Sequence, residues 1–284
     1  VEGSDFYACP VLSPDGTMLA WQAWEHPEMP WDSNRLWVAE FTPDARLQSP
    51  RTIAGGEDKS VFQPGWSLDG SLYFVSDSSG WWNLYRWREE AIEPVYTGSF
   101  EMGLPQWVFG MSTYAFTGEG TLVAAVNEKG VWHLVAIDPD TGRNRRLSLP
   151  SASYSGLQGL PDGVVCLAGS PREPAAISII RLDGSRPIVL QRAFALNLDA
   201  DRISHPQGIQ FPVEDGYTVH AFYYPPTHPE WVGNEEEKPP CIVIGHGGPT
   251  GAADPSLDLR TQFWTSRGFA VLDVNYRGST GFGR

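Results

Sequence analysis

Residues 65–87, GWSLDGSLYFVSDSSGWWNLYRW, decide the fold of this chain. A Leu-Asp-Gly turn precedes an apolar run, and a polar turn then leads to a second run rich in aromatic residues. Asp in such a turn hydrogen-bonds its own backbone, and Gly accepts positive φ because it has no Cβ. The stretch therefore predicts two strands of a sheet that packs on both faces.

Three other segments repeat this pattern. Anchoring the repeats on Gly16, Gly70, Gly120 and Gly163 gives steps of about 40 to 55 residues, the period of four-stranded propeller blades. One blade cannot bury both of its faces, so blades stack around an axis. We predict a β-propeller over residues 1–200, with about four blades of an expected seven-bladed ring present. An unrelated β-sandwich with similar turns is the alternative. The other segments are VLSPDGTMLAWQAWE with NRLWVAEF, YAFTGEGTLVAAVNEKGVWHLVAID, and LQGLPDGVVCLAGSPREPAAISIIRLDG.

The pattern changes after Leu198. Residues 203–226 predict a hairpin, and CIVIG (241–245) predicts a central strand because it is apolar throughout. Residues 256–269 have helical periodicity that stops at Gly268, and another apolar strand leads into the glycine-rich end of the chain. This order predicts the N-terminal part of an α/β domain over residues 201–284. The apolar face of the helix is expected to contain Leu257, Leu259, Phe263 and Trp264.

Composition narrows the class of protein. The formal net charge of −14 argues against a general nucleic-acid binder and against binding to an anionic membrane surface. No stretch is long and apolar enough to span a membrane. Cys166 and Cys241 stand in apolar runs where a buried, reduced thiol is expected, which favours the cytoplasm. No His, Cys, Asp and Glu group has the spacing of metal ligands, so neither a metal nor a cofactor is predicted.

Several motifs together point to one family. Behind the propeller pattern stand HGGPTGAADPS (246–256) and SRGFAVLDVNYRGSTGFGR (266–284), besides WEHPEMPWDSNRLWVAE (24–40) in the first repeat. With these motifs the chain resembles the prolyl oligopeptidase family of serine peptidases, in its acylaminoacyl-peptidase or dipeptidyl-aminopeptidase-like branch. The resemblance implies a β-propeller followed by an α/β-hydrolase catalytic domain.

The resemblance also assigns roles within the HGGP loop. The amide of Gly248 is expected to donate to an oxyanion, with Gly247 shaping the turn. His246 is expected to position the loop, because a general base would follow its serine in hydrolase chain order.

Two charged residues outside the HGGP motif are further candidates. Arg277 is expected to help orient the loop, with a substrate carboxylate or an internal ion pair as alternative partners. Glu101 is expected to face solvent, the alternative being a subsite for the amino terminus of a peptide.

The nucleophile is missing from this stretch. No Gly-x-Ser-x-Gly elbow occurs in residues 1–284, and GSTG (278–281) has the wrong spacing. The catalytic Ser, Asp and His are therefore expected beyond Arg284, and the chain alone is predicted to be inactive. The predicted protein is a serine peptidase acting on short peptides, with the remainder of the same polypeptide as partner and a homo-oligomer left open. An esterase-like hydrolase and a non-enzymatic propeller module are the alternatives.

Overall fold

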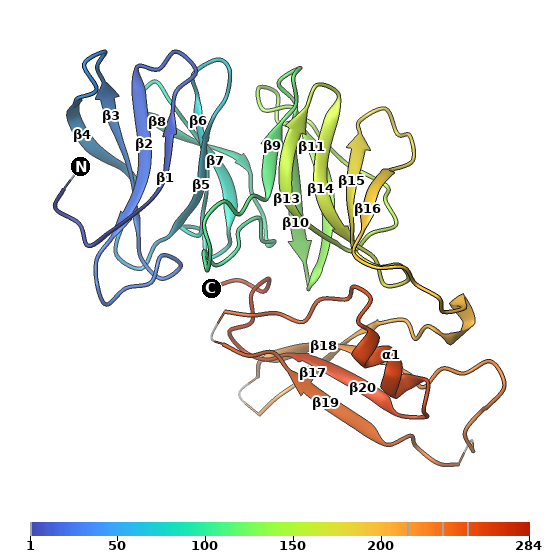
Figure 1. Cartoon of the computed structure of the whole chain (residues 1–284). Helices are drawn as coiled ribbons and strands as arrows, with labels where there is room; N and C mark the ends of the chain where they lie inside the picture. The colour runs from blue at the N-terminus through green and yellow to red at the C-terminus, as the bar shows by residue number, and fades with distance from the viewer. Residues whose placement is uncertain (1, 215, 235, 249) are drawn as a thin grey trace.

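Four antiparallel sheets stand side by side, and a fifth, mixed sheet lies beneath them (Figure 1). The structure is a computed structural model that describes residues 2–214, 216–234, 236–248 and 250–284. Each of the four antiparallel sheets joins four strands that are consecutive in the sequence. The four repeated segments thus supply strands of four separate sheets, as predicted. The described residues form an open row of sheets and no closed ring.

The first two sheets come from residues 6–96. In each, the third strand pairs with both the second and the fourth, so all connections are hairpins. Their bounds are β1 Phe6–Leu12, β2 Met18–Trp24, β3 Arg35–Phe41 and β4 Leu47–Gly55, then β5 Val61–Trp66, β6 Leu72–Ser76, β7 Asn83–Arg88 and β8 Ala91–Tyr96.

The third and fourth sheets come from residues 114–192 and have the same meander order. A short 3₁₀ turn, Ala200–Arg202, follows the last strand. The bounds are β9 Tyr114–Phe116, β10 Leu122–Glu128, β11 Val131–Ile137 and β12 Asn144–Arg146, then β13 Ser153–Leu160, β14 Gly163–Gly169, β15 Ala176–Arg181 and β16 Ile188–Arg192.

The turn glycines do not all act in the same way. Gly16, Gly70 and Gly120 have φ of +72°, +83° and +83°, as the turn pattern requires. Gly163 does not share this conformation, so the expectation of positive φ is wrong there. A Cβ at Gly163 would lie 2.1 Å from the carbonyl oxygen of Ile180 on the neighbouring strand. Glycine is needed at this position for close approach of two backbones.

Apolar cores fill the spaces between neighbouring sheets. Phe62 and Tyr73 of the second sheet pack with Leu122 and Val135 of the third, and all four are at most 1% exposed. Strand β6 is buried along its whole length, and β10 up to its last residue. Burying a side chain of this size stabilises the fold by about 1.5–3 kcal/mol, so stacking of the sheets supplies the main stabilisation of this half.

The two ends of the row present apolar side chains without a neighbouring sheet. Tyr7 and Leu12 on the first sheet are 38% and 49% exposed, and Leu167 and Ile177 on the fourth are both 46% exposed. A hollow of about 780 Å³ beside the first sheet includes Trp21 and Trp37 in its lining. Both end faces resemble the covered faces in residue type, but no further sheet among the described residues packs on them.

The fifth sheet contains β17 Gln207–Pro212, β18 Thr218–Tyr224, β20 Ala270–Asn275 and β19 Cys241–Gly245, in that spatial order. Strands β19 and β20 are parallel, and the other pairs are antiparallel. A parallel pair needs a crossover connection, which here includes α1, Leu259–Thr265. The predicted strand–loop–helix–strand order is present.

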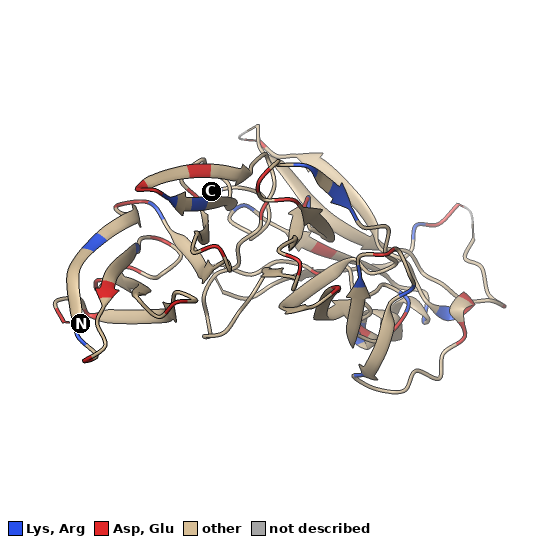
Figure 2. Ribbon diagram, turned by 90° about the horizontal axis from the view of Figure 1, so that it is seen from above, with Lys and Arg blue, Asp and Glu red and all other residues tan. Residues whose placement is uncertain are grey.

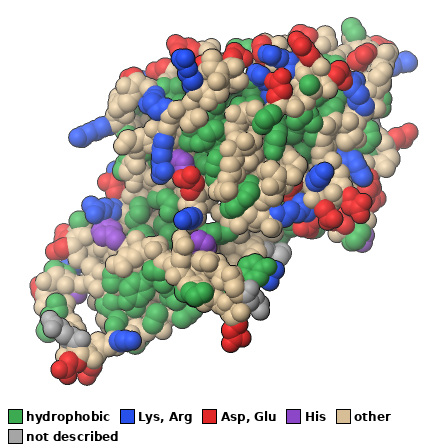
Figure 3. All heavy atoms as spheres, turned by 180° about the vertical axis from the view of Figure 1, so that it is seen from behind, with side chains coloured by type: hydrophobic (Ala, Val, Ile, Leu, Met, Phe, Trp, Pro, Cys, Tyr) green, Lys and Arg blue, Asp and Glu red, His purple; other side chains and the backbone are tan. Residues whose placement is uncertain are grey.

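Strand β19 is an edge strand in the described sheet, so its prediction as a central strand is wrong. Its residues alternate between exposed and half-buried, because only one face meets the packed layer. Val243 is 66% exposed, and Cys241 is exposed rather than buried as expected. Cys166, by contrast, is buried at 2% exposure. Figure 3 shows hydrophobic side chains gathered over the lower part of the molecule.

Helix α1 also departs from its predicted packing. Its buried residues are Thr261, Gln262 and Thr265, while Phe263 and Trp264 are 49% and 39% exposed. The side chain of Gln262 explains this orientation. Its Oε1 accepts from the Ser204 amide at 2.7 Å and its Nε2 donates to the Ser204 carbonyl at 3.1 Å, which holds the polar side of the helix inward.

Acidic and basic residues are interspersed on both halves of the ribbon (Figure 2). None of the helices in the described part of the chain has the length and hydrophobicity that a membrane span requires. Within the same residues no cluster of His, Cys, Asp and Glu has a geometry suited to a metal ion.

Candidate functional site

The loop after β19 leaves two glycine amides available. Gly247 and Gly248 are exposed, and Gly248 has φ of +76°, a conformation that favours glycine. No acceptor among the described residues takes the N–H of either glycine. Pro249, the last residue of the HGGP motif, lies outside the described residues. Two exposed amides without internal partners can donate to a ligand oxygen.

His246 is held from two sides by the chain that follows β20. Its ring stacks on Tyr276 with centroids 4.2 Å apart, and its Nε2 lies 2.7 Å from Ser279 Oγ. Ser279 Oγ donates its own proton to the Tyr276 carbonyl at 2.7 Å, so it accepts from Nε2–H of His246. This arrangement fixes the tautomer and orientation of the imidazole.

Tyr276 also holds the backbone of the loop. Its hydroxyl lies 2.9 Å from the carbonyl of His246 and 3.2 Å from that of Gly248. The loop is fastened further along the chain as well. Thr280 N–H donates to the Gly251 carbonyl at 2.9 Å, and Asn275 Oδ1 accepts from the Ala253 amide at 2.8 Å. Residues 275–280 therefore determine where loop 246–253 lies.

The pair of Ser279 and His246 has the spacing of an activated serine nucleophile. Two observations oppose that role. Ser279 is only 3% exposed, so a substrate carbonyl cannot reach it, and its proton already goes to the Tyr276 carbonyl. The pair therefore fastens one loop to another.

Arg277 points to a different neighbour from the one expected. Its guanidinium lies 3.9 Å from the centre of the Tyr217 ring and donates to the Tyr217 hydroxyl at 2.8 Å. The ion pairs found among the described residues do not include Arg277. It joins the end of β20 to the β17–β18 hairpin, and no bond connects it to the glycine loop in the described residues.

The end of the chain reaches the row of four sheets. Gly283 N–H donates to Glu101 Oε1 at 2.9 Å, and the Arg284 amide donates to the Gly80 carbonyl at 2.9 Å. The Arg284 side chain pairs with Asp77 and donates to the Asp32 carbonyl at 2.7 Å. These contacts connect the first two sheets with the segment that follows Tyr276.

Glu101 is buried at 2% exposure, so the expectation that it faces solvent is wrong. Burial raises the pKa of its carboxyl to about 7, although two backbone N–H groups donate to it, and the nearby charge of Asp77 adds to the rise. Burial also raises the pKa of Asp77, against the lowering influence of Arg284 and the Ser60 amide. The sequence does not predict this burial, because Glu101 lies in a loop between strands, where charged residues are usually exposed.

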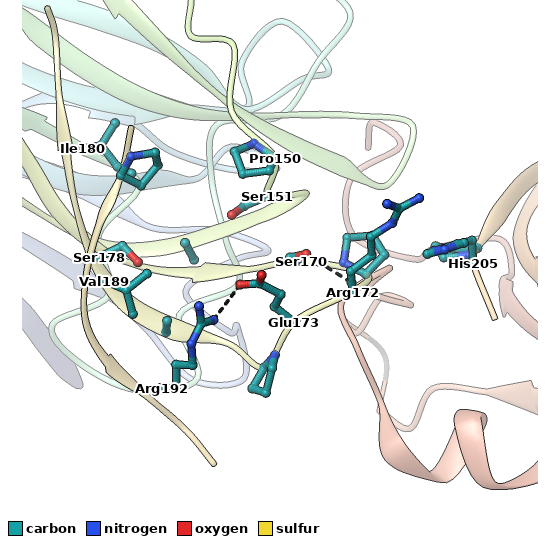
Figure 4. Close-up of a pocket in the computed structure, with 16 residues that line it drawn as sticks. Pro150, Ser151, Ser170, Arg172, Glu173, Ser178, Ile180, Val189, Arg192 and His205 are labelled. Carbon is teal, nitrogen blue, oxygen red and sulfur yellow. Dashed lines mark hydrogen bonds and ion pairs between the residues drawn. The ribbon is translucent and has the colours of Figure 1, made fainter. Parts of the chain in front are cut away.

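A hollow of about 350 Å³ lies apart from the glycine loop (Figure 4). It opens on the fourth sheet, between Ser178, Val189 and the segment that carries Glu173. Arg192 and Glu173 form an ion pair of 2.6 Å across it. Because none of the loop residues lines this hollow, the candidate site is defined by the available amides rather than by a cavity.

Comparisons with known proteins agree with the resemblance. No family model matches the chain. The structure of a Mycobacterium tuberculosis puromycin-hydrolyzing peptidase superimposes with a TM-score of 0.95 and 38% identity, covering 100% of this chain and 44% of that one. The rat (Rattus norvegicus) acylamino-acid-releasing enzyme is 29% identical over 172 residues, 59% of this chain and 21% of that protein. Dipeptidyl-peptidase 5 of Aspergillus fumigatus is 24% identical over 302 residues, 96% of this chain and 39% of that protein.

These proteins define the class to which the chain is related. The predicted resemblance to the prolyl oligopeptidase family is confirmed, because the homologues of this chain are serine peptidases of that family. The chain spans 21% and 39% of the length of the two curated relatives named above.

Proposed function

We propose that residues 1–284 are part of a serine peptidase that cleaves short peptides and that they supply its oxyanion loop. Residues 1–200 are assigned to the propeller and 201–284 to the start of the α/β-hydrolase domain. The observation that carries the proposal is the pair of exposed amides at Gly247 and Gly248, in a loop held by His246 and Tyr276. Homology to peptidases of this family supports it.

The loop would act when a nucleophile attacks the peptide carbonyl. The carbon becomes tetrahedral, and the carbonyl oxygen takes the negative charge. A preorganised N–H donor stabilises that charge by about 3 kcal/mol, and Gly248 is assigned as one such donor. The second donor is the amide after the nucleophile. Because residues 1–284 contain no Gly-x-Ser-x-Gly elbow, the catalytic Ser, Asp and His are assigned to the polypeptide beyond Arg284.

The bare ends of the row of sheets support a larger propeller. Tyr7 and Leu12 at one end and Leu167 and Ile177 at the other are exposed apolar residues on the outer sheet faces. Further blades at both ends would bury them as the inner faces are buried, within the seven-bladed ring predicted from the repeat. Such a ring limits access to the site, which favours short peptides as substrates.

The uncovered parts of the fifth sheet support a larger hydrolase domain. Strand β19 has an unpaired edge among the described strands, and Val243 on its outer face is 66% exposed. Phe263 and Trp264 on α1 are exposed as well. A further strand at this edge and helices over these side chains complete the domain in the proposal.

Cys9, Cys166 and Cys241 form no disulfide, which accords with the proposed cytoplasmic location.

Labelling of the intact protein with a fluorophosphonate tests the proposal. We expect stoichiometric labelling, and hydrolysis of aminoacyl or acyl-aminoacyl p-nitroanilides in preference to simple esters. Ser279→Ala tests Ser279 as the nucleophile, because it removes the serine that is bonded to His246 in the described residues. Labelling should be slower, because Ser279 helps to hold the loop, but it should still reach one label per chain. Loss of labelling in Ser279→Ala with the fold retained, or no labelling of the wild type, would show that the assignment is wrong.

A further inference from the structure

We infer that Asp77 and Glu101 are positioning residues for the oxyanion loop, acting through residues 281–284. The inference rests on the proposed function of the loop. Both carboxylates belong to the second sheet and its connection to the third, far in sequence from residues 246–248. A continuous series of contacts connects the two carboxylates with residues 246–248, across the boundary between the row of sheets and the fifth sheet.

Each carboxylate divides its two oxygens between its own sheet and the end of the chain. Glu101 Oε2 accepts from the Trp82 amide at 2.8 Å, while Oε1 accepts from Gly283. Asp77 Oδ1 accepts from the Ser60 amide at 2.7 Å, while Oδ2 pairs with Arg284. A purely internal role would not require this division. The second oxygen of each group serves segment 281–284.

The carboxylates are themselves rigidly placed. Glu101 and Asn127 exchange two backbone hydrogen bonds of 3.0 and 2.8 Å, which fix residue 101 against β10. Asp77 is 4% exposed, directly after β6. A buried carboxylate that loses a hydrogen-bond donor is costly, so the second sheet holds Gly283 and Arg284 firmly.

The path continues from residue 283 to the glycine loop. Gly281 lies against the Asn127 side chain, where an added Cβ would come within 3.1 Å, so the segment has little freedom. Thr280 is bonded to Gly251, and Ser279 and Tyr276 hold His246 as described. The position of the Gly248 amide therefore depends on where residues 276–284 are held. A displacement of about 1 Å in such a donor costs about 100-fold in rate.

The experiment compares Glu101→Ala with Glu93→Gln in the intact protein. Glu93 belongs to the same sheet and pairs with Arg86 at 2.7 Å, but it does not contact segment 281–284. Active sites are titrated with a fluorophosphonate, so that kcat is expressed per competent site. For Glu101→Ala we expect kcat to fall by about 10- to 100-fold with KM within twofold, because the donor acts on the transition state. Glu93→Gln should retain the wild-type kcat.

Arg284→Ala decides the matter if Glu101→Ala does not fold, since the Arg284 side chain is partly exposed and is expected to tolerate truncation. It should lower kcat per site in the same way. A kcat within twofold of the wild type in every variant that folds, or an equal loss in Glu93→Gln, overturns the inference.

Amide hydrogen exchange separates this inference from the proposed function. Faster exchange of the Ala253 and Thr280 amides is expected in Glu101→Ala or Arg284→Ala and not in Glu93→Gln, whether or not the protein is a peptidase. Unchanged exchange at these amides would show that Glu101 and Arg284 do not hold the loop in place, even in an active enzyme. An inactive wild type with the expected exchange pattern would instead overturn the peptidase assignment alone.

Discussion

The row of four sheets and the fifth sheet bury similar side chains in different ways. In the row, the strands of the second and third sheets meet neighbours on both faces, and β6 is wholly buried. In the fifth sheet, Ile242 and Ile244 pack against Phe222 and Val271, whereas Val243 between them is 66% exposed. The same kind of apolar run is thus a core strand in one region and an edge strand in the other. What differs is the number of layers around it.

The largest effect should separate the two regions directly. Phe62→Ala removes a side chain that is 1% exposed between the second and third sheets, and the unfolding free energy should fall by about 3–5 kcal/mol. Phe263→Ala on α1 removes a ring that is 49% exposed, so it should change the unfolding free energy by about 0.5 kcal/mol or less. Urea unfolding of both variants measures the difference. Equal losses would show that the outer face of α1 is covered.

An intermediate effect should arise where the regions meet. Burial raises the pKa of Glu101 to about 7, so the folded state retains a proton that the unfolded state releases at lower pH. The contribution to stability is present in acid and is lost as pH rises from about 4.5 to about 7, by about 3 kcal/mol at most. Asp77 shifts in the same direction, and Arg284 opposes it.

Glu101→Gln should flatten this dependence in urea unfolding between pH 5 and 8. Glu93→Gln serves as control, because the pKa of Glu93 is lowered by its bond to Arg86 and it does not titrate in that range. If the unfolding free energies of wild type and Glu101→Gln fall in parallel as pH rises, the pKa of Glu101 is not raised by burial.

The smallest effect concerns the polar fastening of the glycine loop. Tyr276→Phe keeps the ring stacked on His246 but removes the hydroxyl that bonds the carbonyls of His246 and Gly248. We expect a loss of about 1 kcal/mol in unfolding free energy, since a net hydrogen bond contributes about that much. A loss as large as that for Phe62→Ala would mean that the fifth sheet depends on this loop more than on its apolar core.

Sequence patterns revealed the inner strands of each blade-like sheet and missed the outer ones. Strands β8, β12 and β16 are largely exposed, so burial does not impose an alternating pattern on them. The pattern of β19 was visible, but its place at the edge depends on which other strands are present. Similarly, the helical period at 256–269 predicts a helix, and the structure has one over the shorter span Leu259–Thr265. Its buried face is determined by the bonds between Gln262 and Ser204.

The candidate site was predictable only in its glycine loop. HGGP marked the amides, and the resemblance gave them a role. Tyr276 and Ser279 hold the loop, but in the sequence they belong to a glycine-rich segment after a predicted strand, and this pattern does not indicate what their side chains contact. The burial of Glu101 and its bond to Gly283 join residues 182 positions apart, a distance over which local pattern carries no information.

The connection pattern has a consequence for the order of folding. Each of the four sheets can form one hairpin after another as its residues leave the ribosome, because every strand pairs only with strands next to it in the sequence. The fifth sheet must instead wait for Val271 to reach Tyr224, because β20 inserts between strands made much earlier. Synthesis that pauses before residue 270 would therefore leave a folded row of sheets with a hairpin and an unpaired strand attached, a species exposed to aggregation.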